Sequence, residues 1–204
     1  MAEYKLHCFA QSGNAYKVAL ALELAGADWE PLWVDFFKGA HRGEDYAAKN
    51  IMAEVPVLEH AGNTFSQSGV ILDYLTETLG KFAPSDRREA MRWILWDNHK
   101  LTANLATWRF VANFLPDDKR SPDVAAFLKG RAVAALKTLD AHMNGRDWIV
   151  GDALSIADLS CIGYFYYTEH YDYDWHQVPN VVAWRDRIAA LPGWKHPNDL
   201  MPGA

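Results

Sequence analysis

The chain has 204 residues, of which 50% are hydrophobic and 23% charged, with a formal net charge of −6. This composition is typical of a globular protein and excludes a disordered chain. The acidic balance, without any basic run, argues against nucleic acid as a partner. No run approaches the ~18 apolar residues of a membrane span, and the first residues do not resemble a signal peptide. We therefore expect a soluble, cytoplasmic protein with no membrane partner.

The two cysteines, Cys8 and Cys161, are too few for a disulfide framework, and their spacing is not that of a metal site. The eight histidines are scattered and form no H-E-x-x-H motif. We therefore expect no bound metal and a reducing compartment.

The first part of the chain alternates strands and helices. Strands are predicted at residues 4–9 and 29–36. Apolar residues at helical spacing predict a helix between them that ends at Gly26. A strand, a helix and a strand joined by short links imply parallel pairing of the two strands.

A hairpin is predicted next, because residues 57–60 and 64–65 flank the short loop of residues 61–63. Ser68-Gly69 then opens a helix with apolar residues on one face. The first 80 residues therefore predict a small mixed sheet covered by helices, an α/β domain.

Strand signals nearly vanish after Lys81. Pro84 marks a linker, and Ser85 or Asp86 is a suitable helix cap. Helical patterns then occupy residues 87–114, 123–144, 155–170 and 180–191. The sequence thus predicts two domains, an α/β domain over residues 1–80 and an all-α domain over residues 87–204.

Three short sequences are candidates for chemistry, and the first is Ser12-Gly13-Asn14 between the first strand and the first helix. A helix start presents free N–H groups and the positive end of the helix dipole, which favour an anion. A hydroxyl there can donate to a thiolate. The alternative is that Ser12 or Asn14 only caps the helix.

The second sequence is Glu54-Val55-Pro56-Val57. A cis proline there would expose the main chain of Val55 to an extended peptide, whereas a trans proline would only begin a strand. The third is Gln67-Ser68-Gly69, where Ser68 can cap the third helix or hold a carboxylate with the N–H groups that follow.

With these sequences in this order, the chain resembles the cytosolic glutathione transferases over essentially all its length. The resemblance is carried by Ser12, by residues 50–58, by Gln67-Ser68 and by residues 151–158. It implies a thioredoxin-like N-terminal domain followed by an all-helical domain. The last stretch contains a capping box, Ser155 to Asp158, which we interpret as structural.

The resemblance also implies a role for each matching residue. Ser12 occupies the place of the serine that donates a hydrogen bond to the sulfur of glutathione. Val55 would pair with the cysteinyl part of glutathione, with Pro56 in the cis form. Gln67 and Ser68 would hold the γ-glutamyl end, and Gln67 replaces a more frequent acidic residue.

Two more binding residues are implied with an alternative each. Asn14 would contact the sulfur or cap the helix, and His41 would lie near the glycine carboxylate or on the surface. Glu54 departs from the Lys or Gln of many members, and there it would repel a carboxylate of the ligand. Gly69 likewise replaces residues that often help binding.

The implied function is a glutathione transferase that activates the glutathione thiolate for attack on a small hydrophobic electrophile, as in detoxification. One alternative is a glutathione-dependent thiol or peroxide reductase that depends on Cys8, although a buried cysteine is usually inert. Another is a non-enzymatic binding protein with this fold. Trp108 and Tyr167 of the helical domain are candidate walls of the electrophile pocket.

The resemblance further implies a homodimer in which the N-terminal domain packs on the partner's helical domain. An aromatic fraction of 13% with nine tryptophans is consistent with such an interface. In this arrangement Asp97 or Asn98 would reach the partner's glutathione near Gln67.

Overall fold

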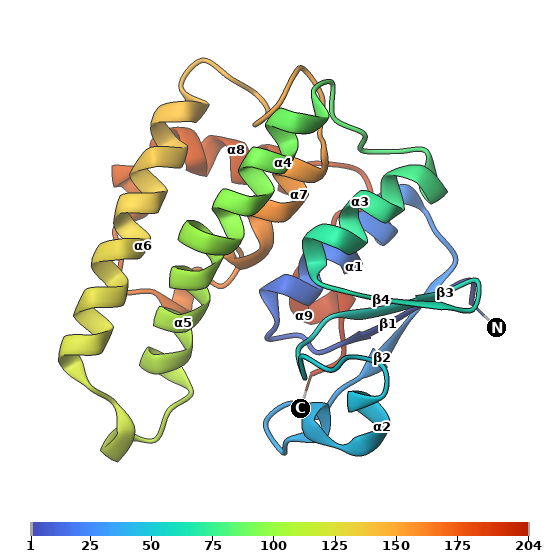
Figure 1. Ribbon diagram of the computed structural model, residues 1–204. Coiled ribbons are helices and arrows are strands. Elements are labelled where there is room, and N and C mark those ends of the chain that lie inside the picture. Colours follow the sequence, from blue (N-terminus) through green and yellow to red (C-terminus); the bar gives the residue numbers. More distant parts are fainter. Residues whose placement is uncertain (1, 204) are drawn as a thin grey trace. The chain divides into compact units, whose positions relative to one another are not determined.

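The computed structural model describes residues 2–203, which form two compact units (Figure 1). Among these residues, unit 1 runs to Ala83 and resumes at Ala189, and unit 2 is Pro84–Ile188. The predicted domain boundary instead groups residues from 189 onward with the helices. The difference arises because the Ala10 N–H donates to the carbonyl of Pro202 at 2.8 Å, which pairs the tail with unit 1.

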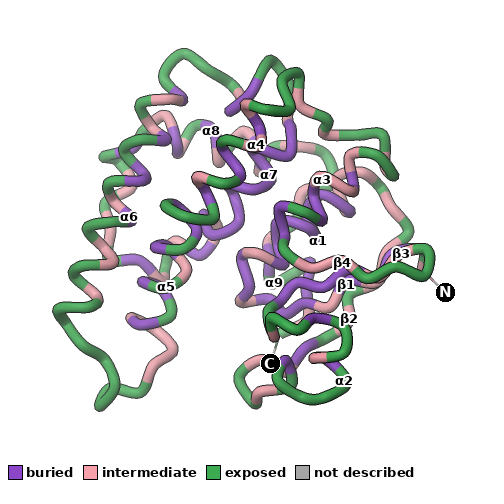
Figure 2. Tube along the Cα trace, in the orientation of Figure 1, coloured by how far each residue is buried: buried purple, intermediate pink, exposed green. Residues whose placement is uncertain are grey.

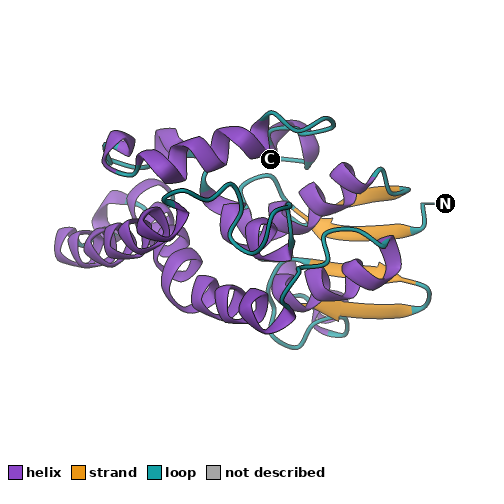
Figure 3. Cartoon of the chain, turned by 90° about the horizontal axis from the view of Figure 1, so that it is seen from above, coloured by secondary structure: helices purple, strands orange, loops and turns teal. Residues whose placement is uncertain are grey.

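A four-stranded mixed sheet forms the centre of unit 1, and Figure 3 shows its strands side by side. The strands are β1 (Tyr4–Cys8), β2 (Trp29–Trp33), β3 (Val57–His60) and β4 (Asn63–Ser66). Their order is β2-β1-β3-β4, with β1 parallel to β2 as predicted and antiparallel to β3. His60 pairs with Asn63, so the hairpin loop is one residue shorter than predicted.

Helices cover both faces of this sheet, with α1 and α3 together on one face and α2 on the other (Figure 1). The helices are α1 (Gly13–Ala25), α2 (Glu44–Ala47), α3 (Ser68–Leu79) and α9 (Pro197–Leu200). Most of α1 is buried (Figure 2). It ends at Gly26, whose φ of 70° suits the glycine that the sequence places there.

Unit 2 is all-helical over its described length. Its helices are α4 (Arg87–Trp96), α5 (Thr102–Asn113), α6 (Pro122–Met143), α7 (Ile156–Cys161) and α8 (Pro179–Ala189). A π-helical turn, Asp97–Leu101, separates α4 from α5 within the single helix that the sequence predicts. None of the helices in residues 2–203 has the length and apolar character needed to cross a membrane.

Helix α7 is much shorter than the predicted helix over residues 155–170. It gives way to a 3-10 turn at Ile162–Tyr164. Beyond that turn, the aromatic side chains pack in different directions: Phe165 lies edge-on to Trp184, and Tyr167 lies beneath Arg109. The aromatic run thus packs within unit 2 through short 3-10 turns and not through a continuous helix.

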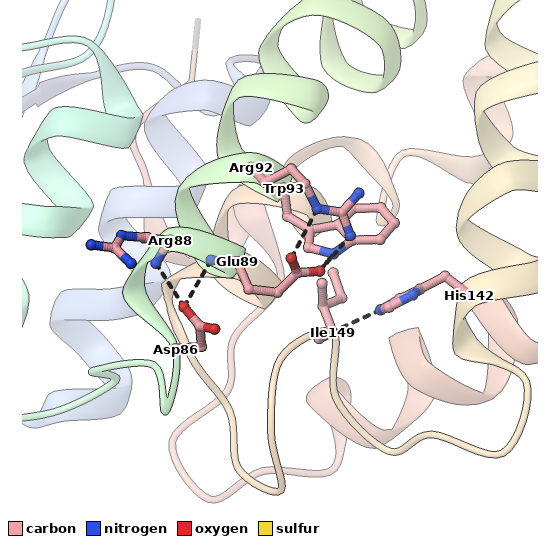
Figure 4. A network of polar contacts seen from close by, with 7 residues as sticks. All are labelled: Asp86, Arg88, Glu89, Arg92, Trp93, His142 and Ile149. Atoms are coloured by element: carbon pink, nitrogen blue, oxygen red, sulfur yellow. Dashed lines mark hydrogen bonds and ion pairs between the residues drawn. The ribbon is translucent and has the colours of Figure 1, made fainter.

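Polar contacts fix the start of α4 (Figure 4). Asp86 is its N-cap and accepts two N–H groups of the first turn, at 2.9 and 3.1 Å. Glu89 accepts from the indole of Trp93 at 3.1 Å, and that indole packs against His142 of α6. The imidazole in turn bonds the carbonyl of Ile149 at 2.8 Å. These contacts join α4 to the end of α6.

The predicted capping box begins α7. The Ser155 hydroxyl accepts from the N–H of Ala157, and the Asp158 carboxylate accepts from the Ser155 N–H at 3.0 Å. Asp158 is fully buried and also accepts from the Ile149 N–H at 2.9 Å and the Trp184 indole at 3.0 Å. These contacts confirm that Ser155 and Asp158 are structural.

Candidate functional site

Ser12 lies in the short link between β1 and α1, and it is buried at the N-terminus of that helix. Its hydroxyl oxygen accepts from the Ala15 N–H at 3.1 Å, so Ser12 is the N-cap. A hydroxyl that accepts in this way still has its own proton to donate. The two interpretations of Ser12 are therefore compatible: one side chain can cap the helix and donate to an anion.

Asn14 follows in the first turn of α1 and is not the cap. Its Oδ1 atom is buried without a hydrogen-bond partner among the described residues. Buried polar atoms are nearly always hydrogen-bonded, and the exceptions gather at functional sites. The carboxamide of Asn14 therefore suits a ligand that donates a hydrogen bond beside Ser12.

Cys8 is the last residue of β1, and its thiol is fully buried. Burial raises the pKa of this thiol to about 12. Because only the thiolate is a strong nucleophile, burial and the raised pKa disfavour attack by Cys8 near neutral pH. Sequence reasoning left open whether Cys8 is reactive, and its environment argues against it.

The loop before β3 contains the cis peptide bond predicted between Val55 and Pro56. Within residues 2–203, the N–H and the carbonyl of Val55 form no hydrogen bond. The preceding carbonyl, that of Glu54, accepts from the Tyr46 hydroxyl at 2.9 Å and from the Asn50 amide at 2.8 Å. The loop is thus fixed on one side, while the Val55 main chain can pair with an extended peptide.

Tyr46 has no counterpart among the predicted site residues. It lies in α2, eight residues before the carbonyl that it holds. A hydrogen bond from a side chain to a distant main-chain atom leaves no spacing pattern in the sequence, so no signal could have found it.

Gln67 and Ser68 begin α3, in a different way from the prediction. Ser68 is the first residue of the helix and Gln67 occupies the cap position without a side-chain cap bond, so the expectation that Ser68 caps the helix is wrong. Gln67 has φ 68° and ψ 112°, a conformation rare outside glycine and typical of functional sites. Ser68 is buried, and the first N–H groups of α3 lack partners within the helix.

His41 is buried, which excludes the alternative that it is a surface residue. Its ring stacks on Phe36 at a centroid distance of 4.1 Å, and Phe36 stacks on Phe9 at the end of β1. Burial, and then the charge of Arg42, lowers the pKa of His41 below its usual value. Its Nδ1 atom has no partner in the described part of the chain, so it can bond a ligand.

Trp108 and Tyr167, the predicted pocket walls, both lie in the interior of unit 2. The Trp108 ring packs against Tyr171 at 5.0 Å, and Arg109 lies 3.9 Å from the Tyr167 ring centroid. Burial also raises the pKa of Tyr167 well above its usual value. These contacts explain both residues as packing and do not support their predicted place on a pocket wall.

Asp97 is also a structural residue. Its two carboxylate oxygens accept from the hydroxyls of Thr102 and Ser160, at 2.7 and 2.8 Å, and the residue is fully buried. The expectation that Asp97 reaches a partner's ligand is therefore wrong. The neighbouring Asn98 is exposed.

In residues 2–203, no group of three or more His, Cys, Asp or Glu side chains is arranged to hold a metal ion.

Comparison with known proteins shows the family of this chain. The family models described as glutathione S-transferase, N-terminal domain, and glutathione S-transferase, C-terminal domain, match residues 2–77 and 101–192. Glutathione S-transferase 1 of Dianthus caryophyllus is 30% identical over 76% of this chain and 72% of its own. Maleylacetoacetate isomerase of Rhizobium meliloti is 27% identical over 98% of this chain and 99% of its own.

A solved structure gives the same family. It is that of a possible glutathione S-transferase from Rhodopseudomonas palustris, which is 32% identical to this chain. The match covers 98% of this chain and 92% of the other, with a TM-score of 0.87.

Proposed function

The chain belongs to the glutathione S-transferase family, and from this premise we propose that it binds glutathione in unit 1 and activates its thiol for attack on a small hydrophobic electrophile. The observation that carries the proposal is the Ser12 hydroxyl at the start of α1, which accepts from the Ala15 N–H and keeps its own proton to donate. The other candidate nucleophile, Cys8, is held as an inert thiol.

Electrostatics at Ser12 accounts for the activation. A free thiol has a pKa of about 8.5, so little of it is ionised at neutral pH. A hydrogen bond from Ser12 and the first-turn N–H groups of α1 favour the thiolate over the thiol. Lowering the thiol pKa by about two units needs about 2.7 kcal/mol, which these contacts can supply. The proton leaves to water, the sulfur forms a bond to carbon, and a leaving group such as halide departs.

The remaining groups of unit 1 fit the rest of the tripeptide. The main chain of Val55, after which Pro56 follows in the cis form, would pair with the cysteinyl residue, and Ser68 would hold the γ-glutamyl carboxylate beside Gln67. His41 would bond the glycine end through its unpartnered Nδ1 atom.

Asn14 completes the sulfur end of the site. Its buried Oδ1 atom can accept a hydrogen bond from the cysteinyl portion of the ligand. Ser12 is the catalytic residue in this assignment, because it touches the reacting sulfur, and the other groups bind and orient.

A second candidate activity is isomerisation, favoured by the Rhizobium meliloti relative, which this chain matches over nearly the full length of both proteins. In such a reaction the thiolate adds to a carbon–carbon double bond conjugated to a carbonyl. Rotation about the resulting single bond and loss of the thiolate then return glutathione unchanged. The same activation by Ser12 serves both reactions. The burial of the Cys8 thiol does not support a reductase that depends on this residue.

We also propose that the protein is a homodimer. Three of the large apolar side chains that unit 1 exposes come from the two segments joined by the contact between Met52 and Gln67: Ile51 (92%), Met52 (56%) and Val70 (57%). Isolated apolar residues on a surface are ordinary, but a local group of them is typical of an interface. The partner's helical unit is the surface that we expect them to meet.

Product analysis tests the proposed activity. The protein is incubated with glutathione and a chlorinated dinitrobenzene, and separately with a cis-enone. A glutathione conjugate that accumulates with release of chloride supports the transferase. Isomerised enone with glutathione recovered unchanged supports the isomerase. If neither product forms above the uncatalysed rate, the proposed function is wrong.

A further inference from the structure

Glu54 and Gln67 come from separate loops and meet at the start of α3. The Gln67 amide nitrogen donates to the Glu54 carboxylate at 2.7 Å and lies 3.1 Å from the sulfur of Met52. Both residues are exposed, so the Glu54 carboxylate is accessible to a ligand that binds at the start of α3. The sequence alone predicts that Glu54 repels the ligand, because it places a negative charge near a molecule that carries two carboxylates.

The structure directs that negative charge to one particular place. The Glu54 main chain is fixed, because its carbonyl accepts from both Tyr46 and Asn50. Its side chain extends to Gln67, the residue immediately before Ser68. The carboxylate thus lies beside the γ-glutamyl end of the proposed site, whereas His41 is assigned to the glycine end.

The γ-glutamyl end is a zwitterion, with a carboxylate and an ammonium on the same carbon. Ser68 and the first N–H groups of α3 are donors, which suit the carboxylate. An ammonium has three donors and no acceptor, so it needs an acceptor close by and binds most strongly to a carboxylate. The carboxamide of Gln67 carries no charge.

We propose that Glu54 binds the ammonium of the γ-glutamyl group, and that Gln67 is a positioning residue that holds the Glu54 carboxylate next to Ser68. This inference rests on the proposed function, because it assigns the part of glutathione that each group recognises. It also gives the uncommon backbone of Gln67, with φ 68°, a role: it directs the amide toward Glu54.

Calorimetric titration with two ligands tests the assignment. The ligands are glutathione and its des-amino analogue, glutaryl-cysteinyl-glycine, which lacks only the ammonium. For the native protein we expect the analogue to bind about tenfold more weakly than glutathione, the effect of one charge-assisted hydrogen bond. Glu54→Gln should weaken glutathione binding by about tenfold and leave the affinity for the analogue unchanged.

Two further variants control the result. Glu44→Gln removes the same charge from an exposed position of unit 1 and should leave both affinities unchanged. The double variant with Glu54→Gln and Gln67→Glu exchanges the carboxylate and the carboxamide between the two positions. It keeps one carboxylate beside Ser68 and should recover most of the glutathione affinity.

Each other outcome overturns the assignment in a distinct way. If Glu54→Gln weakens both ligands equally, Glu54 only shapes the site and does not bind the ammonium. If the variant binds glutathione as the native protein does, the inference is wrong and the proposed function stands. If the native protein binds neither ligand, the proposed function fails and the inference falls with it.

Discussion

Cys8 and Ser12 lie four residues apart, and their surroundings give them opposite chemistry. Cys8 belongs to a strand in the interior, where burial makes its thiolate unfavourable. Ser12 begins a helix, where unpaired N–H groups and its own hydroxyl favour a negative charge on a ligand. Burial thus disfavours the Cys8 thiolate four residues before the helix start at which a bound thiol would be activated.

The inert state of Cys8 predicts slow alkylation. In the native protein at about pH 8, iodoacetamide should leave the Cys8 peptide unlabelled over a time in which free cysteine reacts fully, because a thiol with a pKa of about 12 has almost no thiolate. In denaturant both Cys8 and Cys161 should react. Mass spectrometry of the peptides measures the extent, and rapid native labelling at Cys8 would revive the reductase alternative.

At the scale of single elements, the loop and cap that begin α7 depend on one buried carboxylate. Asp158 satisfies the Ile149 N–H, the Ser155 N–H and hydroxyl, and the Trp184 indole, all within unit 2. Removing it leaves several buried donors unpaired at once. Loss of Asp158 should therefore destabilise the protein more than loss of an ordinary exposed helix cap.

Asp158→Ala should lower the free energy of unfolding by at least about 3 kcal/mol, because each buried donor left unpaired costs about 1–3 kcal/mol. Urea denaturation followed by tryptophan fluorescence measures the loss. Asp86→Ala is the matched control: it removes an exposed cap carboxylate and should cost only about 1 kcal/mol. Equal effects of the two variants would contradict the role assigned to Asp158.

Elements with local signals could be predicted from the sequence. Spacing and turn rules predict the helix that ends at Gly26 and the hairpin of β3 and β4. Capping rules predict the cap residues Asp86 and Ser155. The cis bond before Pro56 came from family resemblance, since the base rate favours trans.

Features set by distant contacts could not be predicted. The burial of Trp108 depends on packing against Tyr171, and that of Asp97 on hydroxyls five and 63 residues away. The bond between Glu54 and Gln67 spans 13 residues and two loops. Helical spacing reports that a face is apolar, but it does not report which neighbour that face meets.

At the scale of the whole molecule, the exposed apolar residues of unit 1 predict how the protein assembles. Light scattering should give a mass of about twice 23.1 kDa at micromolar concentration. Ile51→Ser should shift this mass toward the monomer, because Ile51 is the most exposed of the three apolar side chains.

Trp33→Ser serves as the control for this shift, since it removes an exposed apolar side chain (50%) from β2, at the opposite edge of the sheet from β4. This control should keep the native mass. A native protein with a mass near 23.1 kDa would contradict the homodimer without affecting the assignment of Ser12.

The thiol pKa of bound glutathione tests the central claim most directly. It is read from the ultraviolet absorbance of the thiolate as pH is varied, in the native protein, Ser12→Ala and Ser121→Ala. The last variant removes a serine N-cap from α6 and controls for the loss of a helix cap. We predict a bound thiol pKa about two units below the free value of about 8.5 in the native protein and in Ser121→Ala. In Ser12→Ala it should rise by at least about one unit. The same low pKa in Ser12→Ala would contradict the account, because another group would then stabilise the thiolate.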